Sequence, residues 1–315
     1  MWKYWAIAVG AGLASALAFL FAGSGTLFGM LLTYFAQLPL FLVALSLGAP
    51  ASMAASAAGV LTVVILAGGI FSGLAYVLFN AVPVFVFVRQ ALLSQTDQQG
   101  VVHWYPAGLL LGWLTAAGAA LLTIAAVWLA VQPAGLEGTV TTYVETILEQ
   151  VLPTNLQTGR DRLISRVIPI LPGTVVVAWL IMAIINSTLA QKMLIHFGHN
   201  LRPWPEIAAL ELPQWAPVLA VISVLMWLLP GGFGYYGQNL MLVLLTPFFF
   251  VGLAVVHLLC RRMTVGGFVL FLFYFTLMAL GWPVIVVTVL GFIENWYGLR
   301  RRLVASAPGS PGEEV

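Results

Sequence analysis

Residues 238–260 read QNLMLVLLTPFFFVGLAVVHLLC, and this stretch decides the fold class because it contains no Asp, Glu, Lys or Arg. A helix needs about 20 mostly apolar residues to cross the hydrocarbon core of a bilayer, so this stretch can cross once. Similar stretches recur at 4–22, 26–47, 51–66, 70–88, 104–131, 173–194 and 214–229. The sequence therefore predicts an all-α protein, a polytopic bundle of transmembrane helices.

The composition of the chain supports this prediction. Of its 315 residues, 62% are apolar and only 7% are charged, whereas about a quarter of a soluble domain is charged. The net charge of +2 and the lack of a basic stripe exclude a nucleic-acid partner, and the single Cys260 excludes a disulfide framework. We expect the lipid bilayer to surround one transmembrane domain over residues 1–304, followed by a disordered cytoplasmic tail over 305–315.

The stretch 266–297 is too long for one straight span and has Gly-Trp-Pro at its middle, at 281–283. Two short helices there give about ten spans, and a single helix gives nine. Cytoplasmic loops carry the excess of Lys and Arg. With ten spans, nine basic residues lie on one side and three on the other, namely Arg160, Arg162 and Arg166. This distribution favours the hairpin and places both termini in the cytoplasm.

The ten arginines against two lysines, with many alanines and glycines, are typical of a GC-rich bacterial genome. We therefore expect the bacterial cytoplasmic (inner) membrane. The apolar N-terminus would also permit a cleaved signal peptide. Its single charge, Lys3, and the closeness of the next span favour an uncleaved first helix.

Two segments between the predicted spans are long enough to fold outside the hydrocarbon. The outer loop 132–172 contains two apolar stripes at helical spacing: Val140, Val144, Ile147, Leu148 and Val151, then Leu163, Ile164, Val167, Ile170 and Leu171. They predict amphipathic interfacial helices, which either cover helix ends or form a lid over a cavity. The proline-rich segment 196–213 predicts a strap without a long helix.

The motifs of the usual enzymes are absent from the sequence. It has no G-x-x-x-x-G-K-[ST] for a nucleotide and no H-E-x-x-H for zinc. His196 and His199 would supply two metal ligands without a third. We therefore expect a non-enzymatic protein without a metal or cofactor.

Polar side chains within spans are costly, so they are the candidate ligand-binding residues. One small polar pocket could be lined by Asn80, Asn186, Ser187, Tyr235, Gln238 and Asn239. Gln37 precedes Pro39 in the span 26–47, and Asn80 precedes Pro83 in the span 70–88. Each of these side chains could instead serve a hydrogen bond between helices.

Two further sets of residues are candidates for contacts. The first span carries small residues every fourth position, Ala6, Gly10, Ala14 and Ala18, beside a second ladder of Ala8, Gly12 and Ala16. Such ladders let helices approach closely, either within the chain or in a partner membrane protein. The cytoplasmic ends of the last spans carry a polar cluster of His257, Arg261, Glu294 and Arg300. We expect Glu294 to pair with an arginine, because a buried unpaired charge is costly.

Three elements in the C-terminal half carry a family resemblance. The first is LRPWP at 201–205, followed by LPQW at 212–215. The second is 239–247 followed by GLAVVH at 252–257, and the third is GFIENW at 291–296, followed by three arginines at 300–302. With these, nearly the whole chain resembles the YybS-like family of predicted bacterial membrane proteins. That family is distantly similar to the S components of energy-coupling-factor vitamin transporters and to the rod-shape protein MreD. In S components a small-residue ladder on the first helix docks the coupling subunit. S components typically have about six spans, fewer than expected here, and no vitamin-binding signature is present.

These observations lead to two functional hypotheses. The first is a protein that binds a small solute or lipid of unknown identity, as the substrate-binding membrane component of a transporter. The alternative is a scaffold for envelope assembly or cell-shape complexes that needs no ligand. A polar pocket within the spans would favour the first hypothesis, and a dry interior with an exposed first span would favour the second.

Overall fold

The computed structural model describes residues 2–151, 164–205, 210–298 and 300. Apart from one short hairpin, the regular elements of the described chain are all helices. It forms two compact units: unit 1 comprises Met1–Ala117 and Ala178–Pro205, and unit 2 comprises Gly118–Val177 and Glu206–Val315. The single transmembrane domain over 1–304 stays a prediction, and the tail 305–315 lies outside the described residues.

Unit 1 contains the N-terminal helices together with parts of two later ones. Its elements are α1 (Trp2–Leu20), η1 (Phe21–Ser24), α2 (Leu27–Tyr34), α3 (Leu38–Leu47), α4 (Ala49–Ala67), α5 (Ile70–Tyr76), the π-helical η2 (Val77–Ala81), α6 (Val82–Ala91), β1 (Ser94–Thr96), β2 (Val102–Trp104), and parts of α7 (Ala107–Ala130) and α10 (Leu171–His196).

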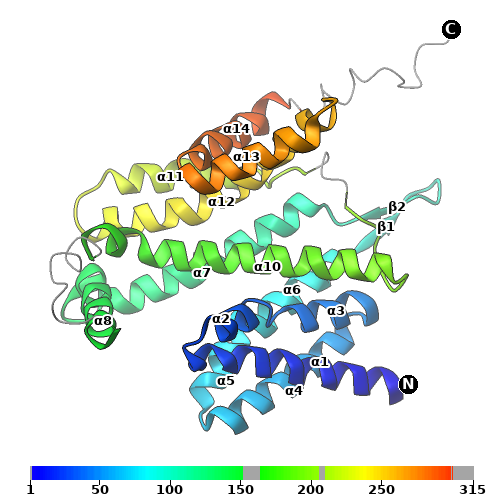
Figure 1. Ribbon diagram of the computed structural model, residues 1–315, viewed down its shortest axis with the longest axis horizontal. Helices are drawn as coiled ribbons and strands as arrows, with labels where there is room; N and C mark the ends of the chain where they lie inside the picture. Colours follow the sequence, from blue (N-terminus) through cyan, green and yellow to red (C-terminus); the bar gives the residue numbers. More distant parts are fainter. Residues whose placement is uncertain (1, 152–163, 206–209, 299, 301–315) are drawn as a thin grey trace. The chain divides into compact units, whose positions relative to one another are not determined.

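Helices α1, α3 and α4 pack side by side, in blue in Figure 1. A Cβ atom at Gly12 would overlap the carbonyl oxygen of Ala55, so glycine is required where α1 crosses α4. The core beneath this crossing includes Leu40, Phe41 and Tyr76, none of which is exposed.

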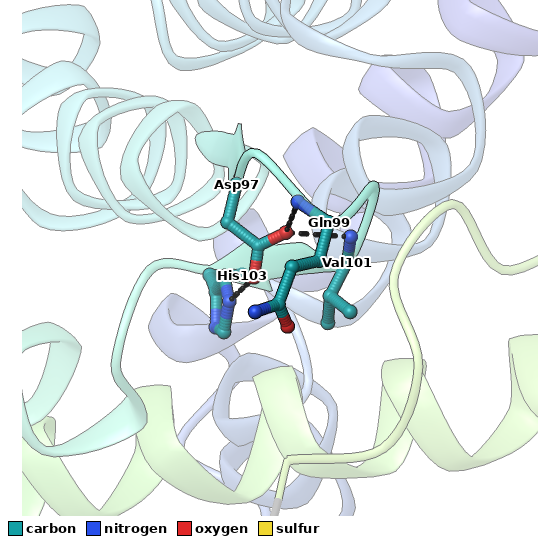
Figure 2. Close-up of polar contacts among 4 residues, drawn as sticks. All are labelled: Asp97, Gln99, Val101 and His103. Carbon is teal, nitrogen blue, oxygen red and sulfur yellow. Dashed lines mark hydrogen bonds and ion pairs between the residues drawn. The ribbon is translucent and has the colours of Figure 1, made fainter.

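The strands β1 and β2 form an antiparallel hairpin that pairs Ser94 with Trp104. Figure 2 shows how Asp97 closes its turn: Oδ1 accepts from the backbone nitrogens of Gln99 and Val101, at 2.8 and 2.9 Å. The other carboxylate oxygen lies 2.9 Å from Nε2 of His103. The hydrogen bond with His103, followed by that with Val101, lowers the pKa of Asp97 below its usual value.

A buried arginine ties this hairpin to its neighbours in unit 1. The guanidinium of Arg202 donates to the carbonyl oxygens of Ala91 at 3.0 Å and Tyr105 at 2.7 Å. The carbonyl oxygen of Arg202 in turn accepts from Nε2 of Gln191 at 2.6 Å. The segment after α10 is therefore held in place without helical structure at 197–205, as the proline content predicts.

Unit 2 is built around α12. Its elements are the remainder of α7, α8 (Gly135–Val151), η4 (Ile168–Ile170), the start of α10, α11 (Trp215–Trp227), α12 (Gly232–Arg261), α13 (Gly266–Leu280) and α14 (Pro283–Tyr297). Helix α12 packs against α11 and α14. Two glycines permit the contact with α14: a Cβ at Gly252 would overlap the carbonyl oxygen of Val287, and one at Gly291 would overlap that of Phe248.

The helices confirm a polytopic membrane protein. Within the described residues, seven helices are long and apolar enough to cross a membrane: Trp2–Ser24, Leu27–Leu47, Ala49–Ala67, Ile70–Ala91, Ala107–Ala130, Ile164–His196 and Gly232–Arg261. Helices α13 and α14 meet at a bend of 118° and add an eighth crossing if they form one span. The predicted number of about ten is higher because α11, α13 and α14 are each shorter than the roughly 20 residues of a full crossing.

The loop 132–172 contains one of its two predicted amphipathic helices as a separate element, α8. Val140 of α8 is buried against Ile168 and Tyr235, with Val144 packed beside them, so part of its apolar stripe faces the core of unit 2. The second predicted stripe is not separate from the next span. From Ile164 onward it continues through η4 into α10, while Leu163 lies outside the described residues. An interfacial location for α8 stays a prediction.

Candidate functional site

Two of the spans in unit 1 are interrupted near their middles. The span Leu27–Leu47 breaks between α2 and α3, and the span Ile70–Ala91 contains the π-helical turn η2. Proline explains both interruptions, because it lacks an N–H and clashes with the carbonyl four residues earlier. Pro39 follows the first break closely, and Pro83 stands four residues after Phe79, whose carbonyl oxygen therefore loses its helical donor.

Side chains donate hydrogen bonds to carbonyl oxygens that lack a helical donor at the two interruptions. The carbonyl oxygen of Phe79 accepts from Nε2 of Gln37 at 2.8 Å and from Nε1 of Trp179 at 2.9 Å. Nδ2 of Asn186 donates to the carbonyl oxygens of Tyr34 and Met182, both at 2.8 Å. We call residues 34–37 and 77–81, with the side chains of Trp179 and Asn186, the paired break.

A second chain of hydrogen bonds supports the first interruption from the side of α1. Oγ of Ser15 donates to the carbonyl oxygen of Ala36 at 2.6 Å, and the hydroxyl of Tyr76 donates to Oγ of Ser15 at 2.7 Å. Ser15 and Tyr76 are fully buried. The backbone of the break is therefore held by α1, α5 and α10.

Two fully buried side-chain oxygen atoms of the paired break receive no hydrogen bond from the described residues. Oε1 of Gln37 and Oδ1 of Asn186 are buried and have no donor among the residues that the structure describes. Both side chains have zero exposed surface. Exchanging the oxygen and nitrogen of either amide would set its oxygen against a carbonyl oxygen, so the hydrogen bonds fix both orientations. Leaving a buried acceptor unsatisfied costs about 1–3 kcal/mol, which a bound donor would offset.

Three of the six predicted ligand residues lie in unit 1. Asn186 is in the paired break, and Asn80 is buried in η2 beside Phe79. Oγ of Ser187 instead donates to the carbonyl oxygen of Ile184 on its own helix, at 3.0 Å.

The other three predicted ligand residues lie in unit 2, and two of them bind the backbone at the start of α10. The hydroxyl of Tyr235 donates to the carbonyl oxygen of Ile168 at 2.9 Å. Nδ2 of Asn239 donates to the carbonyl oxygen of Pro169 at 2.9 Å, and its Oδ1 accepts from the nitrogen of Gly173 at 2.7 Å. Gln238 is half-buried on α12. These bonds give Tyr235 and Asn239 a structural role within unit 2.

The sequence pattern did not identify Trp179, Ser15 and Tyr76 as parts of the site. Each is a residue type that also packs in apolar cores, and only the fold shows which carbonyl it reaches. A usable signal existed in the prolines, because Pro83 identifies the carbonyl oxygen of Phe79 as one that needs another donor.

Over residues 13–294, the chain matches a family described as "Predicted membrane protein (DUF2232)". It belongs to the DUF2232 family. No curated protein and no solved structure matches it. The family match confirms a resemblance to predicted membrane proteins over most of the chain. The YybS-like name and the similarity to S components and MreD stay predictions.

In this DUF2232 protein, one pair of the predicted cytoplasmic-end cluster is confirmed. Nε and the backbone nitrogen of Arg300 both donate to Oε1 of Glu294, at 2.9 and 3.0 Å. Nη2 of Arg300 also donates to the carbonyl oxygen of Leu210 at 2.6 Å. Both side chains are almost fully buried, so this ion pair fastens the end of α14 to the segment before α11.

The other two members of that cluster, His257 and Arg261, lie on α12. Nδ1 of His257 contacts the carbonyl oxygen of Leu253 at 2.8 Å, and its Nε2 lies 3.4 Å from the hydroxyl of Tyr274 on α13. Arg261 is exposed at the end of α12. A contact of His257 with Glu294 or an arginine stays a prediction, and the contacts described place the His257 ring beside Tyr274 of α13.

The two small-residue ladders of α1 have different environments. Ala8, Gly12 and Ala16 are buried, and this ladder forms the contact with α4. Ala6, Gly10 and Ala14 are exposed, Ala18 is half-buried, and no atom lies within 4 Å of the position a Cβ would take at Gly10. The ladder predicted to dock a partner is thus open within the described structure.

Proposed function

We propose that this DUF2232 protein binds a small solute or lipid within the bacterial inner membrane, as the substrate-binding membrane component of a transporter. The observation that carries this proposal is the pair of buried amide oxygens, on Gln37 and Asn186, that lack donors. Interrupted membrane helices are where many transporters bind their substrates, because the irregular backbone there exposes polar groups. The paired break joins two such interruptions through one carbonyl oxygen, that of Phe79.

An exclusively structural role leaves the two oxygens unexplained. The nitrogen atoms of both amides hold the backbone, but these bonds leave both buried oxygens without a donor among the described residues. Polar groups inside the membrane are costly and are most often functional. The predicted similarity of the YybS-like family to S components supports the same function. The proposed activity is binding without chemistry, with both termini in the cytoplasm.

The molecule that co-purifies with the protein tests this proposal. The protein would be extracted from its host membrane, washed, denatured, and its released small molecules identified by mass spectrometry. We expect a stoichiometric solute or lipid with the wild type. The Gln37→Leu variant should lose it, whereas Gln238→Leu, the same change on α12, should retain it. A folded wild type that carries no such molecule would contradict the proposal.

A scaffold role is the second candidate, and the open ladder of α1 favours it. The exposed face of Ala6, Gly10 and Ala14 would admit a closely packed helix of a partner membrane protein. This face is also what docking of a coupling subunit would use, so it is compatible with both functions. Cross-linking from Gly10→Cys in intact membranes would trap the partner. A transporter subunit would support the first function, and an envelope-assembly protein the second.

A further inference from the structure

The exposed basic residues of unit 1 lie at one of its two ends. Lys3 is in the first turn of α1, Arg89 in the last turn of α6, and Lys192 near the end of α10. Figure 1 shows the start of α1, the β1–β2 hairpin that follows α6 and the end of α10 at the same end of this unit. The connections at the other end, 21–26 and 68–69, carry no charged residue. We call the side chains of Lys3, Arg89 and Lys192 the basic end of unit 1.

The buried Arg202 holds two of these positions beside one another. Its guanidinium donates to the carbonyl oxygen of Ala91, two residues after Arg89, at 3.0 Å. Its own carbonyl oxygen accepts from Nε2 of Gln191, the residue before Lys192, at 2.6 Å. The ends of α6 and α10 are therefore fixed next to each other, and each carries one exposed cation.

The three cations of the basic end have no partner among the described residues. Each side chain is exposed, and none makes an ion pair or a hydrogen bond within the part of the chain that the structure describes. The one acidic residue of unit 1, Asp97, already contacts His103 at 2.9 Å and accepts from two nitrogens of its own turn. The positive charge of the basic end is thus not neutralised within unit 1.

Exposed apolar side chains accompany these cations. Trp2 is exposed next to Lys3, and Phe197 and Leu201 are exposed shortly after Lys192. Tryptophan is typical of the boundary between membrane and water, where an apolar body and a polar edge are both accommodated. A soluble anion would pair with the cations and leave Phe197 and Leu201 in water. A partner that suits this surface combines negative charge with hydrocarbon.

We infer that the basic end of unit 1 binds anionic phospholipids. Lys3, Arg89 and Lys192 contact the headgroup phosphates, and the neighbouring apolar side chains contact the acyl chains. Lysine and arginine bind phosphate oxygens through charge-assisted hydrogen bonds, and basic clusters beside membrane helices recognise anionic headgroups. The surface shares no residue with the paired break, so this inference goes beyond the proposed function.

Native mass spectrometry of the full-length protein tests the inference after its release from nanodiscs of mixed phosphatidylcholine and phosphatidylglycerol. We expect phosphatidylglycerol among the bound lipids in excess of its share of the bilayer. In the triple variant Lys3→Gln, Arg89→Gln and Lys192→Gln, its affinity should fall about fivefold for each charge removed. The swapped variant Lys3→Arg, Arg89→Lys and Lys192→Arg keeps the charges and should retain the excess.

Several results would overturn the inference. One is a wild type without any excess of phosphatidylglycerol, and another is a folded glutamine variant with the wild-type excess. Raised salt should weaken the excess because it screens exposed charges, so an excess that salt leaves unchanged would overturn the inference as well. The salt series uses the wild type alone and decides even if the glutamine variant does not fold.

The lipid of the basic end and the ligand of the paired break are measured separately. Phosphatidylglycerol held by the basic end should remain bound to Gln37→Leu, whereas the ligand of the paired break should be lost from it. The glutamine triple variant should show the reverse pattern. Loss of phosphatidylglycerol binding therefore leaves the proposed function standing, and loss of the other ligand leaves the lipid site standing.

Discussion

Nε2 of Gln37 donates to the carbonyl oxygen of Phe79 at 2.8 Å, and this bond joins two interrupted membrane spans. The oxygen of the same amide has no donor among the described residues. One side chain thus holds the backbone with its nitrogen and presents an acceptor with its oxygen. The proposed binding function depends on this division of roles between the nitrogen and the oxygen of Gln37.

Replacing Gln37 by leucine should abolish ligand binding without lowering the stability of the ligand-free protein. Gln37→Leu removes a hydrogen bond, at a cost of about 0.5–1.5 kcal/mol, and also removes an unsatisfied buried acceptor that costs about 1–3 kcal/mol. We therefore expect the melting temperature of the ligand-free protein to stay the same or rise, while the co-purified ligand is lost. A variant that is less stable by more than about 3 kcal/mol would show that the amide is mainly structural.

The two ladders of α1 should respond differently to a large side chain. Gly12→Leu must push α1 away from α4, because a Cβ already overlaps Ala55, and it should destabilise the protein by about 3 kcal/mol or more. Gly10→Leu meets no atom and should leave the melting temperature unchanged. If the ladder docks a partner, Gly10→Leu and Ala14→Leu should reduce partner co-purification. Normal association in both would show that this face is not a docking surface.

Neutralising Glu294 should destabilise the end of α14. Glu294→Gln leaves the buried guanidinium of Arg300 without the carboxylate it now contacts, and such a loss costs about 3–5 kcal/mol. Thermal unfolding in detergent measures this change, and the double variant with Arg300→Met should recover part of it. Unchanged stability combined with lost ligand or partner binding would instead indicate a gate or a partner contact at this position.

The β1–β2 hairpin should be less stable at low pH. The bonds from His103 and from the turn lower the pKa of Asp97 in the folded state, so its contribution to hairpin stability is present above the unfolded pKa of about 4. It is lost as the pH falls through the folded pKa. Hydrogen exchange of residues 94–104, corrected for the intrinsic rate, should therefore show protection that falls below about pH 4. Asp97→Asn should lack this step, and an equal step in the variant would contradict the assignment.

The sequence could predict the helices but not the assembly of the site. Apolar length and low charge identify spans such as 238–260, and buried charge identifies Glu294 as a residue that pairs with an arginine. The six polar residues grouped as one pocket fall into both units, because a single sequence does not show which helices are neighbours. Trp179 carries no polar signal at all, since its ring also fits an apolar core. The span number differs because the stretch 214–229 and the two short helices expected at 266–297 were each counted as a full crossing, whereas α11, α13 and α14 have only 13, 15 and 15 residues.

The most direct test is an experimental structure of the protein purified from its host membrane into lipid nanodiscs. The account predicts density for a bound group about 3 Å from Oε1 of Gln37 and from Oδ1 of Asn186. Well-resolved side chains whose two oxygens both accept hydrogen bonds from the protein itself, with no bound group beside them, would contradict it.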